Sequence, residues 1–352
     1  MSLLRSSVCR ACRRSQQIRW HRGLATASNQ SYDNRVRLVE VGPRDGLQNE
    51  KKAISLETKI ELIERLARTG VSTIEAGSFV APKWVPQMSN SSEILQHILD
   101  GKVSSPGPIS YSFLAPNGKG LKSAADVLSA NSGKFATQLE PAAGAEAATK
   151  PSVEVAVFAA ATESFTQKNL NCDIKTSLER FKEVIRDSKA IGLRVRAYIS
   201  VVLGCPFEGF DVDPHKVAEI ATDLLEAGAD EISLGDTTAG IRTEDIAMHF
   251  HDTYGQALVN TAVSLEHGIR TFDSSVGGLG GCPYSPGATG NVSTENMVYF
   301  METLGMDTGI NLDAMSDIGD WITKELGKEN GSTVGKAVLG ARTRAMQNAK
   351  ES

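Results

Sequence analysis

Residues 273–296 read DSSVGGLGGCPYSPGATGNVSTEN, and this stretch decides the fold class. Its six glycines and two prolines rule out a helix or a regular strand, so the segment must be a shaped loop. A strand-like pattern, IRTFDSSV, leads into it, and STENMVYFMETL follows with a Ser293 or Thr294 cap and helical spacing of apolar residues. The loop therefore joins a strand to a helix, where α/β folds place their chemistry.

The loop itself favours a functional role over a plain surface turn. The glycines of GGLGG (277–281) allow a ligand to approach backbone N–H groups closely. Cys282 follows them and could place a thiol at the rim of such a ligand site. The alternative interpretation is a glycine-rich turn with a chance cysteine.

The rest of the chain alternates strand-like and helix-like patterns. Eight strand candidates are RVRLVEVGPRD, STIEAGSF, ISYSFLAP, VEVAVFAAAT, LRVRAYISVVLG, DEISLGDT, IAMHFHDT and IRTFDSSV, most of them separated by amphipathic helical segments. Alternation at that count predicts a parallel (β/α)₈ TIM barrel over residues 33–311. A doubly wound open sheet is the alternative, and it is weakened because no GxGxxG motif follows the first strand.

Two segments interrupt this alternation. Residues 128–152 are rich in Ala, Ser and Gly without apolar periodicity, which predicts a flexible surface insertion. Two further helical patterns follow the last strand unit, INLDAMSDIGDWITKELG and VGKAVLGARTRAMQ. They predict a C-terminal helical extension over residues 312–352.

The first 32 residues differ from the rest in charge. They carry six arginines and no acidic residue, a composition typical of a mitochondrial transit peptide, and we exclude them from the fold. A basic tail for nucleic acid is the alternative. Without these arginines the formal charge falls from −5 to −11, and so acidic a body argues against a nucleic-acid partner. No run of about 18 apolar residues exists, so no membrane span is predicted.

Three cysteines lie outside this segment, Cys172, Cys205 and Cys282. Their wide spacing predicts neither a disulfide framework nor a zinc-ligand pair, so we expect a reducing compartment. Cys172 and Cys205 are interpreted as structural or incidental, which leaves Cys282 as the thiol of interest.

Polar residues collect where the predicted strands end. Arg44 and Asp45 follow the first strand in GPRDG, Glu75 lies in the second, and Asp236 ends the sixth. Barrel enzymes keep their active sites at the C-terminal ends of the strands, so these side chains are candidates for one shared site.

The seventh strand contributes a pair of histidines. His249 and His251 in HFHD are two residues apart, so on a strand both side chains point to one face. Two imidazoles beside Asp45 form a site for a divalent cation such as Mg²⁺, Mn²⁺ or Zn²⁺. The alternative is one packed histidine and one at the rim.

Several of these segments together resemble a known family. VEVGPRDGLQNE, SFVAPKWVPQM, NCDIKTSLERF, GCPFEG, EISLGDT, HFHDTYGQALVNT and SSVGGLGGCPYSPGATGNVSTE are similar to the mitochondrial hydroxymethylglutaryl-CoA lyases, over nearly the whole chain after about residue 33. Isopropylmalate and homocitrate synthases share the strand-1 motif and the paired histidines, but they lack the cysteine loop.

The resemblance implies metal-assisted retro-Claisen cleavage of 3-hydroxy-3-methylglutaryl-CoA to acetyl-CoA and acetoacetate in the mitochondrial matrix, as in ketone-body formation and leucine degradation. It implies a homodimer, no nucleic-acid or membrane partner, and a divalent cation, Mg²⁺ or Mn²⁺. By motif, the cation ligands are Asp45, His249, His251 and Asn291. The resemblance also implies that Arg44 binds the substrate and neutralises the enolate and that Glu75 orders the substrate. It implies that Cys282 transfers a proton and that Glu295 supports the ligands from behind. A base function of His249 is left open.

The chain departs from this family at one connection. Only TAGIRTED (238–245) separates EISLGDT from IAMHFHDT, whereas parallel neighbours need a crossover of about a dozen or more residues. The family carries a helix here, so a splice variant or a gene-model error is implied. We expect its loss to expose apolar strand surface, to displace His249 and His251 from Asp45, and to impair stability and activity. A catalytically impaired lyase and a condensing synthase therefore stand beside the active lyase as alternatives.

Overall fold

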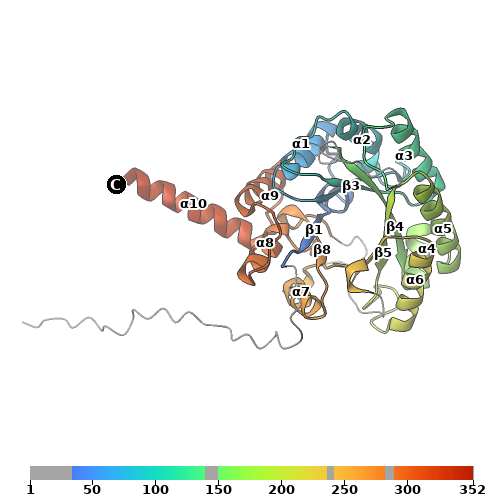
Figure 1. Cartoon of the computed structure of the whole chain (residues 1–352). Helices are drawn as coiled ribbons and strands as arrows, with labels where there is room; N and C mark the ends of the chain where they lie inside the picture. The colour runs from blue at the N-terminus through green and yellow to red at the C-terminus, as the bar shows by residue number, and fades with distance from the viewer. Residues whose placement is uncertain (1–33, 139–149, 236–241, 282–288, 352) are drawn as a thin grey trace, which may run out of the picture. The chain divides into compact units, whose positions relative to one another are not determined.

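Eight parallel strands, hydrogen-bonded in chain order, close into a barrel (Figure 1). The computed structural model describes residues 34–138, 150–235, 242–281 and 289–351. The strands are β1 (Arg37–Glu40), β2 (Thr73–Ser78), β3 (Ser110–Leu114), β4 (Ser152–Ala160), β5 (Arg194–Ser200), β6 (Glu231–Leu234), β7 (Ile246–His249) and β8 (Thr271–Ser274). The predicted (β/α)₈ fold is confirmed, and the open doubly wound sheet is wrong because β8 pairs with β1.

The chain divides into two units, Met1–Asp33 and Asn34–Ser352. The first unit matches the arginine-rich segment and lies outside the described residues. The barrel and the helices that follow it belong to the second.

Helices separate most of the strands and pack on the outer face of the barrel (Figure 1). Ser55 Oγ accepts a hydrogen bond from the Thr58 N–H ahead of the first helix, and Ser293 Oγ accepts one from the Asn296 N–H ahead of α8, so Ser293 forms the cap predicted at Ser293 or Thr294. These helices are α1 (Leu56–Ala67), α2 (Ser91–Leu99), α3 (Gly118–Ala130), α5 (Ile174–Ala190), α6 (Pro214–Glu226), α7 (Ala257–Glu266) and α8 (Thr294–Thr303).

The structure contains one helix, α4, that the sequence did not predict. α4 (Glu163–Leu170) precedes α5, and Thr166 is its one buried residue. A short helix with so little apolar surface has no periodic signal to reveal it.

The C-terminal extension consists of α9 (Leu312–Leu326) and α10 (Thr333–Glu351), as the helical patterns predict. α10 packs on α9 and α8 through its first turns, and from Thr343 to Lys350 its side chains are exposed (Figure 1). Among the described residues, none of the helices has the length and apolar character needed to cross a membrane.

The proposed insertion is only partly described. α3 continues to Ala130 and buries Leu128, so the first residues of 128–152 belong to a helix. Ala136 pairs with Pro151, and Gln138 N–H donates to Gly192 O, which attaches the described part to the barrel. Residues 139–149 lie outside the described residues.

Charged side chains occupy part of the barrel interior. Arg196 of β5 is fully buried, and it forms ion pairs with Asp273 of β8 at 2.5 Å and Glu231 of β6 at 2.9 Å. Such interiors are usually filled by branched apolar side chains. Ile232 and Leu234 of β6 belong instead to the main hydrophobic core, and the buried interior charges are stabilised by pairing with one another.

The connection between β6 and β7 is short, as predicted. Its described part contains the 3₁₀ turn η5 (Thr243–Asp245) and no α-helix, and residues 236–241 lie outside the described residues. β6 and β7 still pair in parallel, with Ile232 opposite Ile246.

The expected exposure of apolar strand surface at this connection is wrong. The side chains Ile232, Leu234, Ile246 and Met248 are at most 5% exposed. Exposed apolar surface is found instead on α7, where Val259 is 54% and Val263 50% exposed. The two valines are four residues apart, so they share one face of a helix whose composition is apolar on most sides.

Candidate functional site

The barrel brings together one carboxylate and two imidazoles from distant parts of the chain. Asp45 lies in the π-helical turn η2 (Gly42–Gly46) after β1, His249 ends β7, and His251 follows two residues later. One ligand atom from each of the three lies within 4.8 Å of the others. The expected displacement of the histidines from Asp45 is therefore wrong.

Asn291 completes the group. It forms a β-bridge with His251, and its Nδ2 donates to Asp45 Oδ2 at 2.8 Å and to Leu279 O at 3.2 Å. Its Oδ1 is buried without a hydrogen-bond partner, which a native fold rarely leaves uncompensated. A carboxylate, two imidazoles and an amide oxygen that lacks a partner fit a divalent cation.

The electrostatics of Asp45 and His251 suit a cation. Burial raises the pKa of Asp45, but the Arg44 guanidinium and the neighbouring His249 outweigh it, so the pKa is lowered and the carboxylate stays ionised. Burial and the charge of His249 lower the pKa of His251 to about 4, so its ring is neutral and can ligate at neutral pH. Burial lowers the pKa of His249 too, but the hydrogen bond that its ring donates to Asp273 and the charge of that carboxylate prevail and raise it.

A buried cation–carboxylate arrangement adjoins the ligands. Arg44 Nη2 lies 2.7 Å from Glu75 Oε2 and Arg44 Nη1 lies 2.9 Å from Asp45 Oδ1. The guanidinium also stacks over the Tyr198 ring at 5.6 Å. Burial raises the pKa of Glu75 more than Arg44 lowers it. Arg44 is thus held in a fixed orientation beside the candidate cation site.

Glu295, expected to support the ligands from behind, forms its described hydrogen bonds at the turn that precedes the glycine loop. It is fully buried at the start of α8, and both of its carboxylate oxygens accept from the Gly277 N–H, at 3.1 and 3.0 Å. Burial raises its pKa to about 8. Glu295 therefore anchors the turn η7 (Val276–Gly278), from which the glycine loop departs, and it supports the site only through that turn.

Glu40 anchors the same turn from β1. Its Oε1 accepts from the N–H groups of Gly42 and Val276, at 2.9 and 3.0 Å, and its Oε2 accepts from Thr294 Oγ1 at 2.7 Å. Burial raises its pKa from 4.5 to about 7 in spite of these hydrogen bonds. This carboxyl joins the turn that carries Asp45 to the turn that leads into the loop.

We expect Glu40→Gln to flatten the dependence of stability on pH. The folded chain keeps this proton up to about pH 7, whereas the unfolded chain releases it near 4.5, so the free energy of unfolding falls as pH rises through that window. The loss is on the order of 3 kcal/mol at most. Urea unfolding at pH 5 and pH 7.5 should show a smaller difference for Glu40→Gln than for the parent chain. If the free energy of unfolding changes equally between the two pH values in both proteins, the raised pKa of Glu40 is contradicted.

Two residues singled out in the sequence, Asp236 and Cys282, lie outside the described residues. Of the other two cysteines, Cys205 is buried, and Thr162 Oγ1 donates to its Sγ at 3.2 Å. Cys172 is partly exposed and free.

The structure also places residues at the site that sequence reasoning missed. These are Gln48, whose Nε2 donates to Asp45 Oδ1, and Arg196, Tyr198 and Asp273, which point into the barrel beside His249. A signal exists in β5, where RVRAYIS carries Arg196 and Tyr198 two apart, on one face of the strand.

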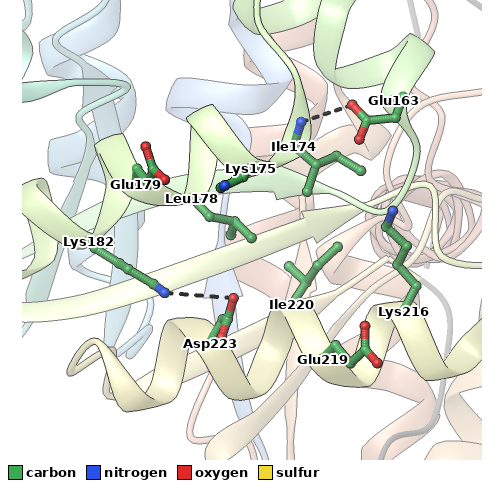
Figure 2. A pocket seen from close by; sticks show the side chains of 10 residues that line it. All are labelled: Glu163, Ile174, Lys175, Leu178, Glu179, Lys182, Lys216, Glu219, Ile220 and Asp223. Carbon is green, nitrogen blue, oxygen red and sulfur yellow. Dashed lines mark hydrogen bonds and ion pairs between the residues drawn. The ribbon is translucent and has the colours of Figure 1, made fainter.

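A groove of about 350 Å³ lies elsewhere, on the outer face of the barrel between α5 and α6 (Figure 2). Lysines and acidic side chains alternate along it, and Lys182 pairs with Asp223 at 3.7 Å. The Glu163 carboxylate accepts from the Ile174 N–H there and ties α4 to α5. We interpret it as a solvated space between two helices rather than an active site.

Comparison with known proteins identifies the family of the chain. The sequence model of the HMGL-like family matches residues 35–245 and 238–322, two matches that meet in the β6–β7 connection. Among curated relatives, 3-hydroxy-3-isohexenylglutaryl-CoA/hydroxy-methylglutaryl-CoA lyase of Pseudomonas aeruginosa is 48% identical over 87% of this chain and 97% of its own length. The mitochondrial hydroxymethylglutaryl-CoA lyase of Bos taurus is 43% identical over 90% of this chain and 93% of its own.

Solved structures give the same result. The crystal structure of hydroxymethylglutaryl-CoA lyase from Pseudomonas aeruginosa superposes with a TM-score of 0.74 at 46% identity, covering 88% of this chain and 99% of that one. An HMG-CoA lyase from A. baumannii, in complex with coenzyme A and 3-methylmalate, gives a TM-score of 0.74 at 30% identity, over 88% of this chain and 96% of that one. On fold and sequence alike, the chain belongs to the HMGL-like family of hydroxymethylglutaryl-CoA lyases.

Proposed function

We propose that the chain cleaves 3-hydroxy-3-methylglutaryl-CoA to acetyl-CoA and acetoacetate. The observation that carries the proposal is the convergence of Asp45, His249, His251 and the partnerless Asn291 Oδ1 beside a fixed arginine, Arg44. The names of the relatives and the coenzyme A in the A. baumannii complex support an acyl-CoA substrate.

The residues suit retro-Claisen chemistry. A base takes the C3 hydroxyl proton, that oxygen becomes a ketone while the C2–C3 bond breaks, and the bonding electrons pass to C2 and the thioester oxygen as an enolate. The enolate then takes a proton at C2 to become acetyl-CoA. A divalent cation, when bound, polarises the substrate oxygens and lowers the pKa of the hydroxyl.

Arg44 is placed to neutralise the enolate oxygen. Its guanidinium is held by Glu75 and Asp45, so it needs no reorganisation when charge develops on the substrate. Glu75 keeps this orientation and orders the polar groups of the substrate. His249 would help to hold the cation, because Asp273 engages Nδ1 and leaves Nε2 available as a ligand atom.

Cys282 is proposed to transfer the proton to the enolate. We expect Cys282→Ser to retain the fold and cation binding but to lower turnover by about 10²-fold or more, since a hydroxyl is far less acidic than a thiol. Cys172→Ser, at a free and partly exposed thiol, is the matched control and should turn over normally. Normal turnover of Cys282→Ser would remove the thiol from the reaction.

The finer assignments are part of the same proposal. The cation is Mg²⁺ or Mn²⁺ because one carboxylate and one amide oxygen accompany the imidazoles. The arginine-rich first 32 residues and the mitochondrial relatives support a location in the mitochondrial matrix. A homodimer, and a role in ketone-body formation and leucine degradation, rest on the resemblance alone.

A coupled assay tests the reaction. The purified chain with Mg²⁺ or Mn²⁺ should release acetoacetate from 3-hydroxy-3-methylglutaryl-CoA, and the isohexenyl thioester named for the Pseudomonas relative should be assayed beside it. A condensing synthase would instead release free CoA from acetyl-CoA and a keto acid. Release of free CoA without any acetoacetate would show that the chain is a condensing synthase and not a lyase.

A further inference from the structure

A buried aspartate, Asp273, lies directly behind one of the candidate cation ligands. It is 2% exposed, in β8, and its Oδ2 is 3.1 Å from Nδ1 of His249. The contact follows from strand pairing, because His249 and Asp273 are register partners in the parallel β7–β8 ladder. Neighbouring strands therefore place the carboxylate beside the ring without help from a loop.

The carboxylate is itself held in place from two other strands. Arg196 Nη2 of β5 donates to Asp273 Oδ1 at 2.5 Å, and Ser233 Oγ of β6 donates to Oδ2 at 2.9 Å. Arg196, which is fully buried, also supplies a positive charge directly beside this carboxylate. Asp273 is therefore an ionised acceptor with a fixed direction.

An acceptor at Nδ1 decides which ring nitrogen can bind a cation. When Oδ2 accepts the Nδ1–H, the lone pair of the neutral ring lies on Nε2. Histidine ligands generally donate their second N–H to a carboxylate or carbonyl, which fixes the tautomer and the orientation of the ring and raises its basicity.

We propose that Asp273 is a positioning residue for the cation site: it fixes the tautomer and orientation of His249, and Arg196 and Ser233 hold its carboxylate in place. The proposal rests on the proposed function only in that the site binds a divalent cation. It assigns a role to a residue in the middle of a strand, away from the glycine loop.

The barrel offers a matched control for this contact. Glu231 is, like Asp273, a buried carboxylate paired with Arg196, with Oε1 2.9 Å from Nε. The described contacts of Glu231 are with Arg196, Arg37 and Arg194, and not with His249. Glu231→Gln therefore disturbs the same buried arginine without touching the histidine.

The test is Mn²⁺ affinity of the full chain without substrate, measured from the EPR signal of free Mn²⁺. Asp273→Asn should weaken Mn²⁺ binding by about 10- to 100-fold, whereas Glu231→Gln should change it by less than about threefold. Equal weakening in the two variants, or affinity of Asp273→Asn within threefold of the parent, would overturn the proposal. If the Mn²⁺ affinities are as expected but the parent chain releases no acetoacetate, the positioning role of Asp273 stands and only the proposed lyase reaction is rejected.

A measurement on the parent chain covers the case in which Asp273→Asn does not fold. With ¹⁵N-labelled histidine and bound Mg²⁺, the His249 signal, assigned by its loss in His249→Gln, should show a protonated Nδ1 and an unprotonated Nε2. A protonated Nε2 with an unprotonated Nδ1 would overturn the proposal.

Discussion

His251→Ala is expected to abolish cation-dependent turnover, to below about 1% of the parent, while the barrel still folds. The ring is one of three groups whose ligand atoms lie within 4.8 Å of each other, and its lowered pKa, about 4, keeps it neutral and free to ligate at neutral pH. Removing it leaves too few ligands to hold the ion in a fixed geometry. Acetoacetate release, with Mg²⁺ or Mn²⁺ added back, measures the effect.

His267→Ala is the matched control for this variant. His267 is an exposed histidine after α7, so its removal should leave turnover unchanged. Thermal melts of both variants should coincide with that of the parent in the absence of metal. Full activity of the parent in excess EDTA, or of His251→Ala, would contradict a cation-dependent reaction.

Inserting a helix of the length usual in the family after Gly240 is expected to raise both the melting temperature and the turnover of this chain. The two family matches meet at this connection, and its described part has no α-helix. A new neighbour for α7 would cover the half-exposed Val259 and Val263. That adds on the order of 1 kcal/mol for each valine, or a few degrees for a domain of this size.

Turnover should rise by about tenfold or more in the helix-inserted chain, because a helix packed on the outer face of β6 and β7 would restrict the motion of the strand that carries His249. A second substitution tests the cause. Val259→Asp should be nearly neutral in the present chain, where the side chain is 54% exposed, and destabilising by about 1–3 kcal/mol in the helix-inserted one. If the two chains melt and turn over alike, the short connection is not a defect.

The barrel is predictable from the sequence because its signals are local. Apolar runs of strand length, separated by capped amphipathic helices such as the one after Ser55, specify the alternation without knowledge of distant contacts. α4 has no such signal, since Thr166 is its one buried residue. The exposure expected at the short connection is wrong because it assumes that the apolar side chains of β6 and β7 can be buried only by the missing helix.

The candidate site is predictable only in part. Asp45 and the two histidines follow from the rule that barrel chemistry gathers where strands end, together with the two-residue period of a strand. Asn291 comes from the family resemblance, because it lies in irregular chain whose path no pattern fixes. Asp273 is missed because its role depends on pairing with β7 and on Arg196 from β5.

The charged interior of the barrel also constrains how this sequence can evolve. Arg196 is shared by Asp273 and Glu231, and Glu231 also pairs with Arg37, so a substitution at Arg196 leaves two buried carboxylates without this partner. Loss of one member of such a buried set costs about 3–5 kcal/mol, whereas joint replacement by apolar residues can be neutral. These positions should therefore show strong epistasis: homologues that diverge at Arg196 are expected to have changed at its acidic partners as well, with few viable single-step intermediates between the two states.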